Sequence, residues 1–241
     1  MKKINAKGLL FKDLNELIKD TDERAVTVDN CIGQRYIGAG NSAKKITING
    51  TPGNALGAYL DGASITVHGN AQDATGDTMN DGTIVVYGNT GDATGYAMRG
   101  GKIFIHGNAG YRAGIHMKAY REKQPLIVIG GRTGSFLGEY QAGGTIIVLG
   151  LGCGGKAPVG YFTGTGMHGG RMFLRCNKLP EDLPPQVQAA EATSDDLAEI
   201  TPAIDKFCKL FKEDERAIKD STFYVLTPNT ANPYKRLYTY N

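Results

Sequence analysis

Residues 65–69 read Ile-Thr-Val-His-Gly, and segments of the same type recur at intervals of 19 residues. Each is a short apolar and β-branched run that ends in glycine; the four segments are residues 46–50, 65–69, 84–88 and 103–107. Two further columns keep the same step: the glycines Gly57, Gly76, Gly95 and Gly114, and the long apolar residues Leu60, Met79, Met98 and Met117. Three columns in register over four copies identify a structural repeat.

The spacing of this repeat predicts the fold. A four-residue β-branched run before a glycine is typical of a short strand, and 19 residues are too few for a βαβ unit of about 30 residues. They suit one turn of a solenoid whose parallel strands stack about 4.8 Å apart. We therefore predict an all-β protein, a single-stranded right-handed parallel β-helix with about 19 residues per coil.

Each column then receives a structural role. The glycines are expected at corners that need positive φ or close backbone contact. The Leu/Met column is expected to fill the core, in preference to forming a ligand-facing stripe. A further column is polar and consists of Asn70, Asn89 and Asn108. It is expected to form a ladder of side-chain amides at a corner.

Beyond residue 107 the register stretches, through segments 126–130 and 146–150 to a degenerate segment 172–175. We assign residues 1–30 to an N-terminal cap with a helix over 9–19, residues 31–176 to the β-helix, and residues 177–241 to a C-terminal arm, helix and tail. Within the last part, proline-rich residues 178–203 are expected to be irregular and Ile204–Phe211 to form an amphipathic helix. An aromatic cluster ends the tail: Tyr234, Tyr238 and Tyr240.

Composition narrows the function. The 241 residues include 34 glycines and carry a formal net charge of +3, with the basic residues scattered, so neither nucleic acid nor a membrane is expected as the main partner. The N-terminus has no apolar signal segment, and four widely spaced cysteines suit reduced thiols; both favour the cytoplasm.

No catalytic, cofactor-binding or metal-binding residue is predicted in this chain. The run Gly150-Leu-Gly-Cys-Gly-Gly-Lys156 matches part of a phosphate-binding loop, but Ala157 replaces the required Ser/Thr and Pro158 disfavours the helix that should follow. His68 and His106 share one column two rungs apart, about 9.6 Å, which is too far for a shared zinc ion. A zinc hydratase on a left-handed β-helix and a secreted polysaccharide-lyase type of enzyme therefore remain weaker alternatives.

The sequence predicts that one outer surface of the β-helix is covered. Outward positions of the early coils are polar, whereas those from the third coil onward are apolar, as in a parallel sheet buried on both faces. We expect the chain's own C-terminal helix and tail to cover this stripe, with another subunit as the alternative. The predicted stripe consists of Val85, Phe104, Ile127, Ile147, Tyr87, Ile129 and Leu149.

The run Gly50-Thr-Pro-Gly-Asn-Ala-Leu-Gly57, continued to residue 76, closely resembles the GXGXG domain of glutamate synthase. Residues 22–26, 33–38, 107–117 and 164–170 are similar to the same domain, and the tail at 223–236 more loosely. The resemblance covers residues 22–176 well. It implies that this chain forms the same β-helix as the C-terminal domain of the large subunit of glutamate synthase, but as a separate chain.

The resemblance implies a scaffold in a complex that makes glutamate from glutamine and 2-oxoglutarate. Separate glutaminase and synthase subunits would supply the catalytic cysteine, the FMN and the iron–sulfur cluster, since no such residue carries over to this chain. The β-helix subunit of formylmethanofuran dehydrogenase shares the fold and many of the glycines, and is the nearest alternative. A free-standing binding module and a homo-oligomer also remain open.

Overall fold

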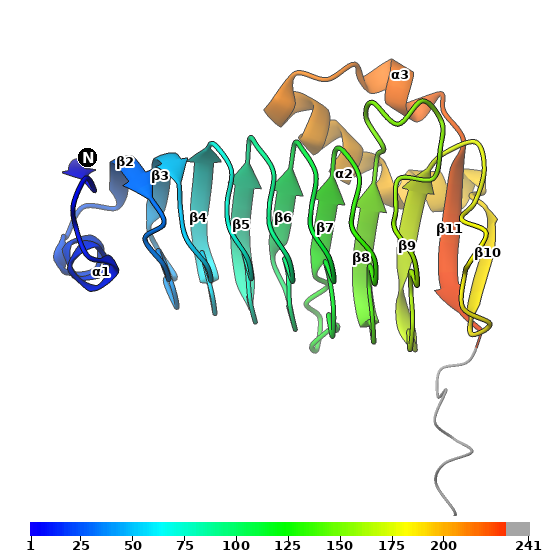
Figure 1. Cartoon of the computed structure of the whole chain (residues 1–241), viewed down its shortest axis with the longest axis horizontal. Helices are drawn as coiled ribbons and strands as arrows, with labels where there is room; N and C mark the ends of the chain where they lie inside the picture. The colour runs from blue at the N-terminus through cyan, green and yellow to red at the C-terminus, as the bar shows by residue number, and fades with distance from the viewer. Residues whose placement is uncertain (230–241) are drawn as a thin grey trace, which may run out of the picture.

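The computed structural model of the protein describes residues 1–229, which form one 11-stranded sheet with three helices beside it (Figure 1). The protein is therefore all-β in class. The strands are β1 (Lys2–Asn5), β2 (Ala25–Ile32), β3 (Lys45–Thr51), β4 (Asp61–His68), β5 (Asp81–Val86), β6 (Lys102–Ile105), β7 (Leu126–Ile129), β8 (Ala142–Val148), β9 (Gly169–Arg175), β10 (Val187–Glu191) and β11 (Phe223–Pro228). The helices are α1 (Phe11–Asp20), α2 (Ser194–Phe211) and α3 (Glu215–Lys219).

Strands β1 to β9 lie side by side in chain order, and each pairs in parallel with the next. Ile46 pairs with Ile65, and Ile65 with Ile84, so the 19-residue repeat places equivalent residues on neighbouring strands. The sheet becomes mixed at its end, because β11 pairs antiparallel with β9, and β10 antiparallel with β11.

The segments that connect the parallel strands also stack on one another. Ala71 pairs in parallel with Thr90, and Ala109 with Thr133. The N–H of Gly76 donates to the carbonyl of Leu56, one coil earlier, at 2.8 Å. The main apolar core contains residues from both the strands and the stacked turns. Each coil is therefore held to its neighbours on both sides of that core.

The second glycine column has the role that the repeat predicts. Gly76 and Gly95 adopt φ of +72° and +70°, and a Cβ there would lie 2.5 Å from Ile103 Cδ1 and 2.4 Å from Ile127 Cδ1. Only glycine accepts both the backbone conformation and the close contact. The Met79 and Met98 side chains are fully buried in the core, which overturns the alternative of a ligand-facing stripe.

Helix α1 lies at the N-terminal end of the sheet (Figure 1). Leu14 and Ile18 are buried in the core, whereas Leu10 and Leu17 are 69% and 43% exposed. The predicted apolar face of this helix was therefore too broad. No helix among residues 1–229 has the length and hydropathy of a membrane span.

The C-terminal part is more ordered than the sequence predicted. Residues 178–203 contain strand β10 and the first part of α2, so the expected irregular arm was wrong over those elements. Helix α2 begins at Ser194, ten residues before the predicted Ile204, because Thr193 and Asp196 form a reciprocal capping box. The predicted aromatic cluster of Tyr234, Tyr238 and Tyr240 lies outside the described residues.

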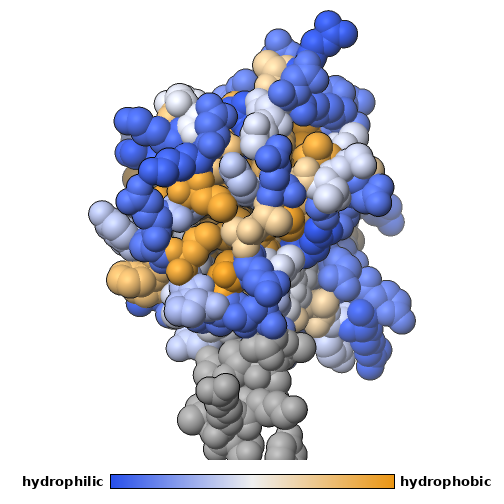
Figure 2. Space-filling model, turned by 90° about the vertical axis from the view of Figure 1, so that its right-hand side faces the viewer, coloured by the Kyte–Doolittle hydropathy of each residue, from blue (hydrophilic) through white to orange (hydrophobic). Residues whose placement is uncertain are grey.

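Apolar side chains gather at the C-terminal end of the stack. Figure 2 looks onto this end and shows them at its centre, within a hydrophilic rim. Leu179, Leu183, Val187 and Ala189 are only partly buried where they pack against the core. Beyond β10, the described residues provide no further strand to cover this end.

Candidate functional site

The outer face of the sheet changes character along the stack. One outward column begins with Thr47 and Thr66, which are partly exposed, and becomes apolar and buried from Val85 onward. These later side chains form a second apolar cluster, separate from the main core, with α2. In register, the column is Thr47, Thr66, Val85, Phe104, Val128, Ile147 and Phe173.

Two members of the predicted stripe do not belong to it. Ile127 and Ile129 pair with Ile103 and Ile105 and lie in the main core. The prediction matched Gly130 to Gly107, but it is Gly131 whose N–H donates to the Gly107 carbonyl. A shift of one residue exchanges the two faces of a strand, so Val128 takes the outward position instead.

Gly130 fills the outward position that the prediction gave to Ile129. A Cβ on Gly130 would lie 2.0 Å from the carbonyl oxygen of His106 and 2.8 Å from Cζ of Phe207, so glycine is required by the neighbouring strand and also makes room for this ring of α2. Phe207 is fully buried and packs at 4.7 Å, ring centre to ring centre, against Phe211. Leu149, in the same column as Gly130, is also buried in this cluster.

The edge of the α2 contact is polar and aromatic. The Tyr87 hydroxyl donates to the carbonyl of Leu210 at 3.2 Å, and the ring of His106 stacks on Phe211 at 4.9 Å. His106 Nε2 lies 2.7 Å from Oε1 of Glu213. Of the two covers that the sequence allowed, the chain's own helix therefore covers the stripe.

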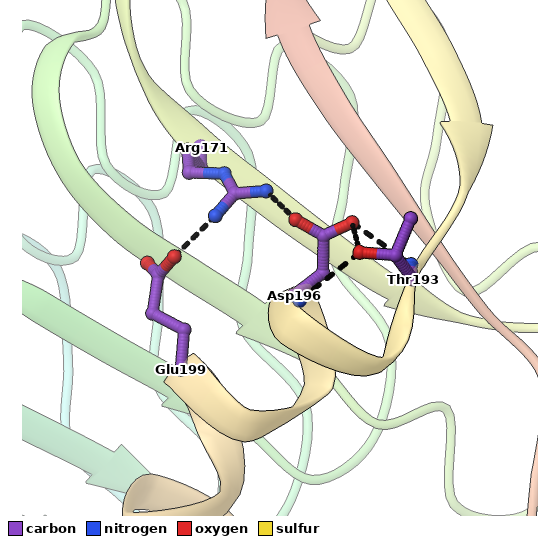
Figure 3. Close-up of polar contacts among 4 residues, drawn as sticks. All are labelled: Arg171, Thr193, Asp196 and Glu199. Atoms are coloured by element: carbon purple, nitrogen blue, oxygen red, sulfur yellow. Dashed lines mark hydrogen bonds and ion pairs between the residues drawn. The ribbon is translucent and has the colours of Figure 1, made fainter.

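Arg171 fixes the start of α2 to the sheet. Figure 3 shows its guanidinium, from β9, between the carboxylates of Asp196 and Glu199, and both are ion-paired with it. Asp196 also accepts hydrogen bonds from the backbone N–H and the hydroxyl of Thr193, both at 2.8 Å. The bond from the Thr193 N–H and the bond from Arg171 lower the pKa of Asp196 from 3.8 to about 2.

This low pKa predicts an acid-sensitive anchor. A carboxylate whose pKa is lower in the folded state stabilises the fold above its unfolded pKa of 3.8, and loses this effect as pH falls toward about 2. Asp196→Asn should reduce the unfolding free energy by about 1–2 kcal/mol at pH 7, as for loss of a helix cap. It should also flatten the fall in stability between pH 4 and pH 2, as measured by urea unfolding followed by circular dichroism.

Asp195→Asn is the matched control, because Asp195 occupies the same first turn and forms no ion pair among the described residues. It should leave both the stability at pH 7 and its pH dependence close to wild type. Equal effects of the two substitutions would contradict the assigned role of Asp196.

Several histidines and cysteines are engaged in packing. His68 lies 4.9 Å from the ring of Tyr87, and His116 stacks on Tyr140 at 5.1 Å. Burial raises the pKa of the Cys31 thiol to about 11, which makes it a poor nucleophile. Within residues 1–229, no group of three potential ligands is placed to bind a metal ion.

The turns opposite α2 carry an exposed aromatic area. Three of its positions belong to a column that is alanine in three earlier coils, at Ala55, Ala74 and Ala93, all with positive φ, and Tyr111 and Tyr161 belong to the adjacent column. The same column then becomes Arg112, Phe136 and Phe162, in successive coils. We define the aromatic turn surface as Tyr111, Arg112, Phe136, Tyr161 and Phe162.

The aromatic turn surface is preorganised. Phe136 and Phe162 stack at 5.0 Å, and the Arg112 guanidinium lies 4.9 Å above the Phe136 ring. Tyr161 and Phe162 nevertheless remain 68% and 51% exposed. Exposed aromatic clusters of this kind mark interaction sites. This surface was not predicted from the sequence, although the change from alanine to aromatic residues in one column was its signal.

The glycine-rich run Gly150–Lys156 forms an exposed loop. No helix follows it: residues 157–168 contain neither helix nor strand, and the next element is β9. The loop thus lacks the helix N-terminus of a nucleotide-binding loop.

Comparison with known proteins identifies the family of the chain. The sequence model of the GXGXG motif family matches residues 12–224. The chain belongs to this family. An uncharacterised protein of Methanocaldococcus jannaschii is 43% identical over 249 residues, which span 98% of this chain and 95% of that protein. The GXGXG membership predicted from the glycine pattern is therefore confirmed.

A solved structure is similar in fold. It is a chain of the formyltransferase/hydrolase complex from Methylorubrum extorquens, determined in complex with methylofuran. The two chains superpose with a TM-score of 0.64 at 20% identity, over 92% of this chain and 88% of that chain. At this identity the likeness shows that the two chains share a fold.

Proposed function

We propose that this GXGXG chain is a non-catalytic structural subunit that docks other protein chains through its aromatic turn surface. The observation that carries the proposal is the contrast between the two outer faces. On the sheet side, the apolar stripe is covered by α2, whereas Tyr161 and Phe162 on the turn side stay more than half exposed. An aromatic surface held by stacking contacts is suited to binding a partner.

We further infer that the coils wind as a right-handed parallel β-helix. The parallel pairing of β1 to β9 and the stacked turns support this inference. Crossover connections between parallel strands are right-handed in about 98% of cases. The stack ends in the mixed part of the sheet formed by β9, β11 and β10.

The complex that we favour is of the formylmethanofuran dehydrogenase type, with this chain in the place of its β-helix subunit. Support comes from the structural likeness, which extends over nearly the whole of both chains and involves a multi-subunit formyltransferase/hydrolase complex. Under this proposal the chain has no cofactor of its own, and the partner subunits carry out the chemistry in the cytoplasm.

A glutamate synthase complex is the second candidate, because the runs at residues 50–76 and 107–117 resemble its GXGXG domain. The partners would then be glutaminase and FMN-dependent synthase subunits, with FMN and an iron–sulfur cluster bound in the synthase. Co-purification from the native cell, with identification of the bound chains, separates the two candidates. Recovery of the chain without any partner would contradict both.

The docking role predicts the effect of one surface substitution. Phe162→Asp should abolish co-purification of the partner chains, because it places a charge at the centre of the aromatic turn surface. Aspartate tolerates the positive φ of 60° at this position, so the unfolding free energy should change by about 1 kcal/mol or less. Partner recovery and thermal unfolding are measured on the same preparations.

Tyr59→Asp provides the control for this experiment. Tyr59 is 58% exposed, has a φ of 57° and lies on an earlier coil, outside the aromatic turn surface. It should leave partner binding unchanged. Loss of binding in both variants, or in neither, would show that the aromatic turn surface is not the specific docking site.

A further inference from the structure

We propose that the pocket formed by Arg132 and the loop 151–157 binds a small oxyanion, either a carboxylate or a phosphate group. The pocket has a volume of about 480 Å³. Its lining residues are Asn108, Arg132, Leu151, Gly152, Cys153, Lys156 and Ala157. This site is independent of the proposed scaffold role.

The pocket arises from an insertion at one corner of the coil. In the two preceding coils, the residue directly after the terminal glycine, Asn108 or Arg132, accepts a backbone hydrogen bond from the coil before it. In the next coil the equivalent acceptor is Pro158, eight residues after Gly150 instead of one. Residues 151–157 are therefore seven inserted residues, and they fold over the corner that carries Asn108 and Arg132.

The charged side chains that line the pocket are all positive. Arg132 and Lys156 are both exposed, and neither forms an ion pair within residues 1–229. None of the lining residues is acidic. The pocket thus concentrates positive charge, in a protein whose other basic residues are scattered.

Hydrogen-bond donors also line the pocket. Asn108 Oδ1 accepts from the Arg132 N–H at 2.9 Å, and no described protein group accepts from the Asn108 amide nitrogen. This finding also corrects the predicted ladder: the side-chain oxygens of Asn70, Asn89 and Asn108 accept from the backbone N–H of the next coil at 2.8–2.9 Å, and of their amide nitrogens only that of Asn89 donates to the preceding asparagine, at 3.3 Å. The donating amide of the last asparagine in the column is left for a ligand.

The loop backbone adds a further donor. The N–H groups of Gly150, Leu151 and Cys153 donate to the backbone carbonyls of Gly131, Gly130 and Gly150. Among residues 1–229, no acceptor is bonded to the N–H of Gly152, which lines the pocket.

The ligand class follows from these groups. Cationic side chains, an amide and a backbone N–H all donate, so the ligand must accept, as carboxylate and phosphate oxygens do. None of the residues that line the pocket is aromatic, so a nucleotide should bind through a phosphate group alone, with no gain from stacking of its base.

The test is a titration of the ¹⁵N-labelled full chain with sodium phosphate or sodium glutarate, with sodium chloride at matched ionic strength as the reference. We expect saturable amide shifts at Gly152 and its neighbours with phosphate, glutarate or both, and the stronger arm identifies the source. The double variant Arg132→Gln/Lys156→Gln should weaken binding by about tenfold or more. Lys209→Gln, an exposed cation on α2, should leave binding unchanged.

Thermal unfolding of the variants serves as the check on folding, and should match wild type because both substituted side chains are exposed. Shifts no larger than those with chloride, or binding that survives the double variant, would overturn the proposal. ATP that binds more than about tenfold tighter than inorganic phosphate would overturn it in favour of a nucleotide site.

Discussion

Phe104→Asp should destabilise the isolated chain severely, by about 4–6 kcal/mol, or prevent cooperative folding. Phe104, on β6, is 1% exposed, and its side chain lies under α2 in the cluster that holds this helix on the sheet. The substitution removes a buried ring and places an unpaired carboxylate under α2. Urea unfolding followed by circular dichroism measures the loss, since the chain contains no tryptophan.

Thr47→Asp separates this effect from that of a charge on any outward strand position. Thr47 lies in the same outward column, three strands earlier, where it is partly exposed and not part of the α2 cluster. It should change the unfolding free energy by about 0.5 kcal/mol or less. Wild-type stability of Phe104→Asp would mean that α2 does not cover the stripe in solution.

Much of the fold could be predicted because a solenoid makes its main contacts at a constant sequence separation. Ile65 touches residues 19 positions away in both directions, so each structural requirement reappears as a column in the sequence. The glycine column is the clearest case, since every member faces an isoleucine of a neighbouring coil. The 19-residue step was therefore enough to predict both the strand pairing and the core.

The register of later coils could not be predicted in the same way. Residues 126–129 read Leu-Ile-Val-Ile, and a strand that is apolar throughout gives no alternation to say which side faces the core. Two consecutive glycines, Gly130 and Gly131, then offered two alignments. In the structure Gly131 pairs with Gly107, and Gly130 is the outward position without a side chain, where a Cβ would meet the His106 carbonyl and Phe207.

The start of α2 was missed for a different reason. Pro202 and its neighbours favoured an irregular segment, but tertiary packing of Ile200 and Ile204 and the ion pairs of Arg171 hold the helix through the proline. The Thr193–Asp196 capping box was the sequence signal for its first residue. The pocket at Arg132 had no such signal, since it depends on where an insertion folds.

Gly95→Ala should destabilise the protein by about 2–4 kcal/mol, through two effects that can be separated. The first is the backbone, because φ at Gly95 is +70°. The second is a clash, because the new Cβ would lie 2.4 Å from Cδ1 of Ile127, which is fully buried. Urea unfolding at neutral pH measures the sum of the two.

Two further variants divide this sum. Gly33 has a φ of +76°, and a Cβ at this position would meet no atom within 4 Å, so Gly33→Ala should show the backbone effect alone, about 1 kcal/mol. Ile127→Val removes the clashing Cδ1 and should itself cost about 1 kcal/mol. If the clash is real, Gly95→Ala combined with Ile127→Val must cost less than the sum of the single variants, by about 1 kcal/mol or more. Strict additivity would mean that the core yields around Ile127, and that backbone conformation alone selects glycine in this column.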